Sequence, residues 1–200
     1  MRFPLFSCGL FAFLLTACAG TIDRRIDPDE NDPVGGAVLQ SQDIRTMADK
    51  MARDIASSGV LTSAPRGERV SFHITSLRND SGDPIDKEII LTKIRTELQR
   101  ALGRGVQVLD RSAEGLEAVQ QERAAKRNGS VAGRESARGN VAGSDYALKG
   151  TIKSRVQQSG GLKSVYYLVT FELTDLETTE IAWSGDYETK FESEKSVISR

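Results

Sequence analysis

Apolar residues recur at helical spacing from residue 41 onward. They fall three or four positions apart, which is typical of a helix with one buried face. Ser41 is placed to cap this helix and Gly59 to end it. Residues 70–75 then alternate between apolar and polar side chains, which predicts a half-buried strand. The apolar positions of these two elements are Ile44, Met47, Ala48, Met51, Ile55, Val70, Phe72 and Ile74.

A second amphipathic helix is predicted after a polar turn at residues 79–83. Asp83 offers a carboxylate to cap this helix, Pro84 suits its first turn, and Gly103 stops it. A short strand at 106–109 follows. The expected buried face of the helix consists of Ile85, Ile89, Ile90, Ile94, Leu98 and Leu102.

A polar helix and a glycine-rich loop come next. The helix is expected from about Ser112 to Arg127, with an apolar stripe limited to Leu116, Val119 and Ala124. Residues 128–143 repeat Val-Ala-Gly around a polar centre, which predicts a mobile loop with room for one helical turn near residues 134–138.

The last third of the chain alternates with a period of two. Gly160-Gly161 and residues 175–179 are the predicted turns, so three strands form an antiparallel meander. Trp183 is expected in the core rather than in a ligand site. The inward positions are Tyr146, Leu148, Ile152, Val165, Tyr167, Val169, Phe171, Leu173, Ile181, Trp183, Tyr187 and Phe191. The fold class is therefore α/β, a single sandwich domain with a mixed, mostly antiparallel sheet of about five strands covered by about three helices.

The N-terminal segment indicates export and lipid attachment. Arg2 precedes an apolar run, and residues 15–18 (Leu-Thr-Ala-Cys) resemble the lipobox of bacterial lipoproteins. That resemblance implies a signal peptide over residues 1–17 and acylation of Cys18, for example with palmitate. Ala19 in place of Asp favours an outer-membrane anchor, with the domain facing the periplasm. The alternative is a plain signal peptide or a short membrane anchor.

Composition divides the remainder in two. Residues 18–40 combine clustered acids with chain breakers, which predicts a disordered tether, and residues 41–200 form the folded domain. The whole chain has a formal net charge of −1, so no basic excess suggests a nucleic-acid partner. Cys8 leaves with the signal peptide and Cys18 carries the lipid, which leaves no thiol for a disulfide or a metal site.

Candidate catalytic and ligand-binding residues are few. His73 is the only histidine, and its place in the alternating strand predicts a solvated outer-face side chain. Asp83 and Asp86 suit a helix N-terminus better than paired acid–base catalysis. Acidic residues near 172–180 could hold Ca²⁺ weakly, but a solvated hairpin tip explains them better. We therefore expect no catalytic residue, no cofactor, no metal and no small-molecule substrate.

Several segments resemble one family of lipoproteins. Residues 144–152 (SDYALKGTI), 171–178 (FELTDLET) and 180–184 (EIAWS) are similar to the LpoB family, as are Asp43-Ile44-Arg45 and residues 79–86. This resemblance implies a non-enzymatic lipoprotein that binds and activates a class A penicillin-binding protein, which is a peptidoglycan synthase. The polar strand faces and loop 128–143 are its candidate contact surfaces.

Two departures from the family pattern, and one alternative, accompany this resemblance. Thr179 stands in the hairpin where the family commonly has Gly, and the tether of 22 residues after Cys18 extends to at most about 75 Å. The same hairpin occurs in secretion lipoproteins of the CsgG type. The alternative function is therefore a structural or secretion-assembly lipoprotein of the envelope.

Overall fold

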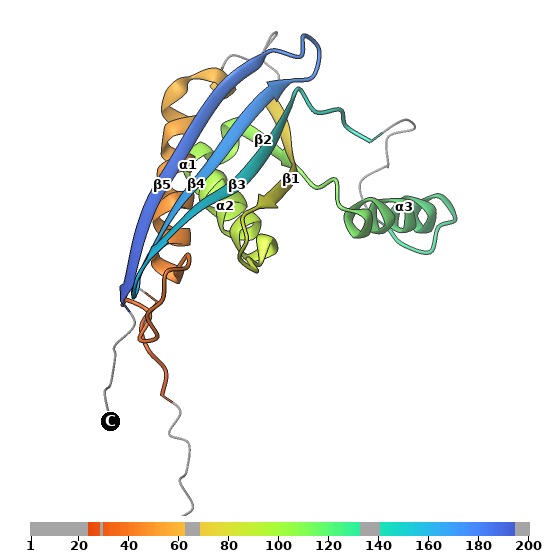
Figure 1. Ribbon diagram of the computed structural model, residues 1–200. Helices are drawn as coiled ribbons and strands as arrows, with labels where there is room; N and C mark the ends of the chain where they lie inside the picture. The colour runs from red at the N-terminus through yellow and green to blue at the C-terminus, as the bar shows by residue number, and fades with distance from the viewer. Residues whose placement is uncertain (1–23, 29, 63–68, 133–140, 195–200) are drawn as a thin grey trace, which may run out of the picture.

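The computed structural model describes residues 24–28, 30–62, 69–132 and 141–194, built around one five-stranded sheet (Figure 1). The strand order across the sheet is β2-β1-β3-β4-β5. Along the chain, the elements are α1 (Ser41–Ser58), the 3-10 turn η1 (Val60–Thr62), β1 (Val70–Asp80), α2 (Lys87–Leu102), the 3-10 turn η3 (Gly103–Gly105), β2 (Val106–Leu109), α3 (Ala113–Arg127), β3 (Tyr146–Ser159), β4 (Leu162–Asp175) and β5 (Ile181–Glu194).

Strand direction divides the sheet into two parts. β1 pairs in parallel with both β2 and β3, and these connections contain helices because parallel neighbours need a crossover. β3, β4 and β5 form the antiparallel meander that the alternating pattern predicted, with Gly160 at φ 59° in the first turn. The predicted fold class, a mixed five-stranded α/β sandwich, is confirmed.

One face of the sheet carries the hydrophobic core. α1 and α2 lie together on this face, and their apolar stripes meet the inward side chains of β1, β3 and β4 (Figure 1). The alternation predicted for β4 is confirmed, because its five inward residues are almost fully buried. The buried apolar residues are Ala37, Met47, Ala48, Met51, Ala52, Ile55, Leu61, Val70, Phe72, Leu77, Ile90, Leu91, Ile94, Leu98, Leu148, Ile152, Val165, Tyr167, Val169, Phe171 and Leu173.

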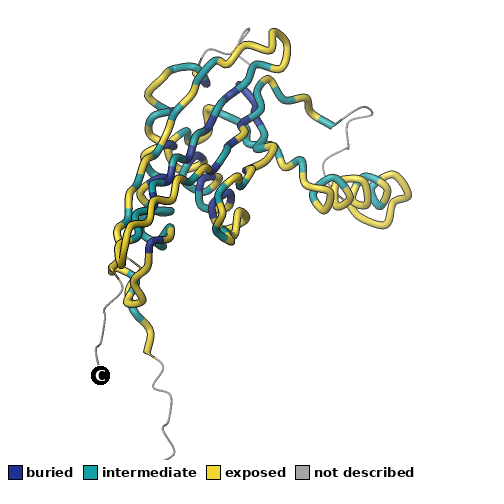
Figure 2. The backbone as a smooth tube through the Cα atoms, in the orientation of Figure 1, coloured by how far each residue is buried: buried dark blue, intermediate teal, exposed yellow. Residues whose placement is uncertain are grey.

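α3 stands apart from the sheet (Figures 1 and 2). Ser112 caps it by accepting a hydrogen bond from the N–H of Gly115 at 3.0 Å, and none of its residues is buried. Its apolar stripe is too sparse to hold it against a sheet. The polar helix is confirmed, but two helices rather than three cover the sheet. The helical turn predicted near residues 134–138 falls outside the described residues.

The helix caps differ from those predicted. The N–H and hydroxyl of Ser41 both donate to Asp32, at 2.8 and 2.7 Å, and Gln40 occupies the cap position of α1. Asp86 caps α2 by accepting from the N–H of Glu88 at 2.9 Å. Asp83 lies ahead of α2, where its carboxylate accepts a hydrogen bond from the hydroxyl of Tyr167. The tertiary hydrogen bond from Tyr167 thus engages Asp83, and Asp86 caps the helix instead.

Two predicted core positions are exposed. Ile89 is 57% exposed because the buried face of α2 is centred one position further along, on Ile90 and Leu91. Ile181 is 51% exposed, because the irregularity between Leu173 and Thr174 shifts the start of β5 relative to β4. Tertiary packing sets the rotation of α2 about its axis and the register at the start of β5. Periodicity alone therefore misplaces Ile89 and Ile181.

Part of the predicted tether packs against the domain. Ala37 is only 6% exposed, and its carbonyl oxygen accepts a hydrogen bond from the hydroxyl of Tyr167 at 3.5 Å. Leu39 also packs against the core. The folded unit therefore includes residues that composition assigned to the segment ahead of residue 41.

Candidate functional site

The face of the sheet opposite α1 and α2 is open in the described part of the chain (Figures 1 and 2). Every second residue of β3, β4 and β5 projects from it, because successive side chains of a strand point to opposite sides. The inward side chains are locked in the core, so this outer face is a rigid polar surface. Its members on the meander are Lys149, Thr151, Lys153, Arg155, Ser164, Tyr166, Leu168, Thr170, Glu172, Ser184, Asp186, Glu188, Lys190 and Glu192.

A hollow of about 360 Å³ lies at the centre of this outer face, over β1, β3 and β4. Three cations line it, with Lys149 paired to Glu172 at 3.0 Å and Arg78 to Asp80 at 2.9 Å. Lys153 carries the third positive charge. The remaining lining residues are Ser76, Gly150, Thr151 and Thr170. The hollow can therefore accept acidic and hydrogen-bonding groups of a partner.

Gly150 forms part of the floor for a steric reason. A Cβ atom at this position would lie 2.6 Å from the ring of Phe171 and 2.8 Å from the side chain of Leu77. Glycine thus lets two core side chains fill the space beneath the hollow. The closely packed floor holds the lining residues of β1, β3 and β4 in fixed positions.

The charge of the outer face changes sign across the meander. The central strand β3 presents Lys149, Lys153 and Arg155, whereas four of the five charged outward residues of β5 are acidic. Partial burial raises the pKa of the Tyr166 phenol, and its hydrogen bond to Glu188 raises it further. A partner that covers the whole face must therefore place acidic groups over β3 and basic groups over β5.

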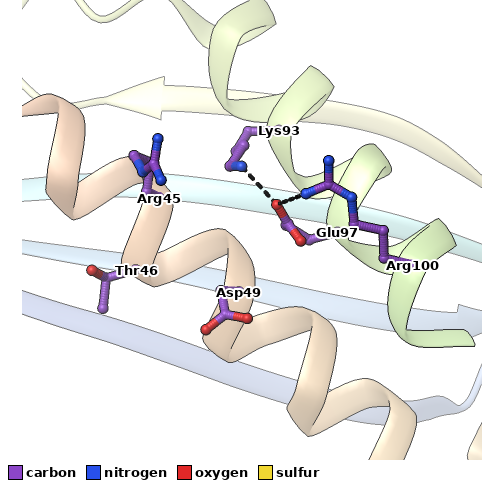
Figure 3. Close-up of a pocket in the computed structure, with 6 residues that line it drawn as sticks. All are labelled: Arg45, Thr46, Asp49, Lys93, Glu97 and Arg100. Atoms are coloured by element: carbon purple, nitrogen blue, oxygen red, sulfur yellow. Dashed lines mark hydrogen bonds and ion pairs between the residues drawn. The ribbon is translucent and has the colours of Figure 1, made fainter. Parts of the chain in front are cut away.

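A second polar hollow, of about 350 Å³, lies between α1 and α2 on the opposite side of the molecule (Figure 3). Lys93 and Arg100 both bind the carboxylate of Glu97, at 2.6 and 2.9 Å. The hydrogen bond from Lys93 lowers the pKa of Glu97, and the charge of Arg100 adds to this effect. Arg45 and Asp49 line the α1 side. Like the hollow of the outer face, this hollow combines three cations with paired carboxylates, but it lies between two helices rather than on a broad open sheet face.

The side chain of His73 is less exposed to solvent than its strand position predicted. The side chain is half-buried, and its Nδ1 lies 3.0 Å from the hydroxyl of Ser144. Partial burial lowers the pKa of His73, and the nearby charge of Arg111 lowers it further. The sequence did not reveal this pair, because Ser144 lies 71 residues further along the chain.

A serine–histidine pair alone is an incomplete catalytic arrangement. The nearby carboxylate of Asp145 accepts from the hydroxyl and N–H of Ser71, at 2.9 and 2.7 Å. The other ring nitrogen of His73 lies 3.5 Å from the hydroxyl of Thr75. In a hydrolytic triad, a carboxylate would orient the histidine. The geometry instead indicates that these polar side chains join the beginning of β3 to β1.

The acidic residues near the β4–β5 turn have structural partners. The carboxylate of Asp175 accepts from the N–H groups of Glu177 and Thr178, at 2.8 and 2.9 Å, and these bonds lower its pKa. Lys149 pairs with Glu172. No group of three potential metal ligands occurs among the described residues.

The proposed anchor lies outside the described residues. Residues 1–17 and Cys18 belong to the segment 1–23, whose structure is not described. Over the ranges that are described, none of the helices combines the length and hydrophobicity needed to cross a membrane.

A comparison with models of protein families identifies the family of this chain. A model for the peptidoglycan-synthase activator LpoB matches residues 43–189, which is most of the chain. The chain belongs to the LpoB family. The resemblance seen in the β4–β5 hairpin and the first helix is thereby confirmed. LpoB is described as an activator of a synthase and is not itself a catalytic family.

Solved structures that match the chain include LpoB domains. The chain is 13% identical to the LpoB C-terminal domain from Salmonella enterica, with a TM-score of 0.42, covering 74% of this chain and 98% of that domain. The corresponding domain from Escherichia coli is 14% identical, with a TM-score of 0.41 and the same coverage. Lipoprotein GNA1162 from Neisseria meningitidis is 19% identical, with a TM-score of 0.39, covering 62% of this chain and 84% of that protein. No curated protein sequence matches the chain.

Proposed function

We propose that this LpoB-family protein is a non-enzymatic, outer-membrane lipoprotein that binds and activates a class A penicillin-binding protein. Family membership supports the synthase as the kind of partner. The proposed docking site is the open outer face, and the observation that supports it is the hollow lined by Arg78, Lys149 and Lys153. A surface of this kind needs no reacting groups to act on a synthase.

Activation follows from differential binding. If the synthase alternates between less active and more active conformations, a partner that binds the active form more tightly increases its population. The core beneath β3 and β4 keeps the outer face in one arrangement, so the face can discriminate between two arrangements of a partner surface. The free energy for the shift comes from this difference in affinity.

Acylation of Cys18 would hold the domain at the outer membrane, facing the periplasm. Because Ala37 packs into the core, only the residues between positions 18 and 37 remain to span the distance from the membrane. Fully extended, these 37 − 18 = 19 steps reach about 65 Å. The partner must therefore present its docking surface within that distance plus the length of the folded domain, since the outer face lies beyond residue 37.

The test is polymerisation of lipid II by the purified class A synthase of the same organism, with and without the protein. Stimulation is expected, and Lys149→Gln with Lys153→Gln should weaken binding to the synthase about tenfold. The matched control is Lys126→Gln with Arg127→Gln on α3, since Lys126 is likewise paired with a glutamate, Glu122, at 3.0 Å.

Three outcomes would contradict this proposal. Absence of binding to any class A synthase of the organism would refute the partner. Binding without stimulation would make the protein a scaffold rather than an activator. Equal loss of binding in the β3 and α3 double variants would remove the outer face as the docking site.

A further inference from the structure

β5 is a long, free edge of the sheet. It runs for 14 residues, or about 46 Å, and pairs only with β4 in the described structure. From Trp183 to Glu194 its register with β4 continues without a bulge. Along the left of Figure 1 it forms the outermost strand. One side of its backbone pairs with no strand of the described structure, and along it only the carbonyl oxygen of Asp186 has a side-chain partner, Lys50 of α1 at 3.2 Å. Another strand can pair with this side once the flexible Lys50 side chain moves aside.

Edge strands are commonly protected from such pairing by shortness, bulges, proline or charge. The opposite edge of this sheet, β2, has only four residues. β5 is long, is regular from Trp183 onward and contains no proline. Apart from the hydrogen bond of Lys50 to the carbonyl of Asp186, its protection is charge, which repels strands of like charge and attracts a strand of opposite charge.

The two faces of β5 have different chemistry. Inward, Trp183, Tyr187 and Phe191 pack on the core but remain half-buried, because no strand lies beyond them. Outward, the exposed side chains are mostly carboxylates: Ser184, Asp186, Glu188, Lys190, Glu192 and Glu194. An added strand would therefore bury apolar side chains on one face and pair basic side chains with acidic ones on the other.

We propose that the free edge of β5 binds an extended segment of another protein, whose residues alternate between basic and apolar, as a sixth strand of the sheet. Its backbone supplies the affinity through main-chain hydrogen bonds, and the alternation supplies the specificity. A second copy of this chain is a poor occupant, because two acidic edges repel. The outward carboxylates of this edge also belong to the outer face, but strand addition at β5 does not depend on the synthase docking proposed above, and the experiment below contains no synthase.

The full chain in detergent is mixed with a ten-residue peptide that alternates lysine and valine, blocked at both ends. Backbone hydrogen exchange should slow in β5 and remain unchanged in α3. Glu188→Lys with Glu192→Lys should weaken binding of the peptide at least tenfold, and should admit a peptide of alternating glutamate and valine. The matched control, Glu114→Lys with Glu117→Lys on α3, applies the same charge change to exposed positions and should leave binding unchanged.

A second peptide separates strand pairing from simple charge attraction. Two forms of the same lysine–valine peptide are made, each N-methylated at alternate residues along one of its two backbone edges. Only the form whose unmethylated edge can face β5 should bind. Equal binding of both methylated forms would overturn the proposal. So would protection outside β5, or dimerisation of the unmodified chain through β5. Thermal unfolding of each variant confirms that it is folded.

Discussion

The hydroxyl of Tyr167, at the centre of β4, donates a hydrogen bond to the carboxylate of Asp83 in the turn before α2. The same hydroxyl reaches the carbonyl of Ala37, 130 residues away in sequence. Burial raises the pKa of Tyr167, and the hydrogen bond to Asp83 raises it further, so the phenol stays protonated as a donor. One buried hydroxyl thus connects the sheet, the turn before α2 and the segment leading to α1.

Replacing Tyr167 with Phe should destabilise the protein. The change removes one donor and leaves Asp83 without this partner, at a cost of about 1–3 kcal/mol in the free energy of unfolding. Release of Ala37 should also make residues 30–40 more sensitive to protease. Urea unfolding and limited proteolysis measure the two effects. Tyr166→Phe on the outer face is the control, and an equal loss of stability there would contradict the assignment.

A Cβ atom at Gly185 should destabilise the β5 end of the core. It would lie 2.5 Å from the ring of Trp183 and 3.2 Å from the sulfur of Met51, so the indole must move. Overpacking of this kind costs about 1–3 kcal/mol, measured by thermal or urea unfolding of Gly185→Ala. Ser184→Ala, one residue away and exposed, should leave the stability nearly unchanged.

Trp183 itself packs against the core and is half-buried. Because part of the ring is solvated, Trp183→Ala should cost about 2–3 kcal/mol, less than the loss at a fully buried aromatic position. Urea unfolding monitored by far-UV circular dichroism measures it. A variant that unfolds like the wild type but loses a binding partner would show that Trp183 is a ligand platform instead.

Thr179→Gly should stabilise the β4–β5 hairpin. Thr179 has φ 66°, a left-handed conformation that a β-branched residue adopts at a cost. The family's glycine is free of that strain, so the substitution should raise the free energy of unfolding by about 0.5–1 kcal/mol. Thr178→Gly is the control and should give no gain, because the Thr178 hydroxyl accepts from the N–H of Glu180 at 3.3 Å. A lower melting temperature for Thr179→Gly would contradict the strain argument.

His73 should make stability depend on pH. Its pKa is lowered on folding, so the unfolded state binds a proton more readily, and stability is lost as the pH falls from about 6.5 through the folded pKa. NMR titration of the imidazole should give a pKa below its ordinary value. Arg111→Gln should raise that pKa by removing a nearby positive charge. A His73 pKa above about 6.5 would contradict the burial argument.

Cys18 should carry the membrane anchor. Cells labelled with radioactive palmitate should mark the wild type and Cys8→Ser, since Cys8 lies within the predicted signal peptide. Cys18→Ser should be unlabelled and should leave the membrane fraction. A labelled Cys18→Ser variant, or an unlabelled wild type, would refute the anchor.

Local rules were sufficient for most of the fold. The period-two alternation of β4 is visible in the sequence because one face of the strand meets the core and the other meets solvent. Gly59 and Gly103 end their helices with positive φ, as glycine at those positions predicted. The hairpin and first-helix residues also carried the family resemblance. Each of these features depends on residues close together in the chain.

Tertiary structure determined the helix cap and the buried helix face at positions where local rules allowed two equal choices. Asp83 and Asp86 were both suitable caps, and Tyr167, more than 80 residues away, binds the first and leaves the second for α2. Packing against α1 likewise placed Leu91 rather than Ile89 in the core. Periodicity gives a helix a buried face, but the neighbouring helix sets the rotation about its axis.

The candidate surfaces also required the folded molecule. The sequence could place lysines on the outward side of β3 and acids on that of β5, but their effect depends on which face stays uncovered. The outer face stays uncovered because the apolar stripe of α3 is too sparse to hold this helix against the sheet. The strand order then exposes β5 as an edge. Alternation along a strand is local and readable, whereas the neighbours of a strand are set by the free energy of packing the whole chain.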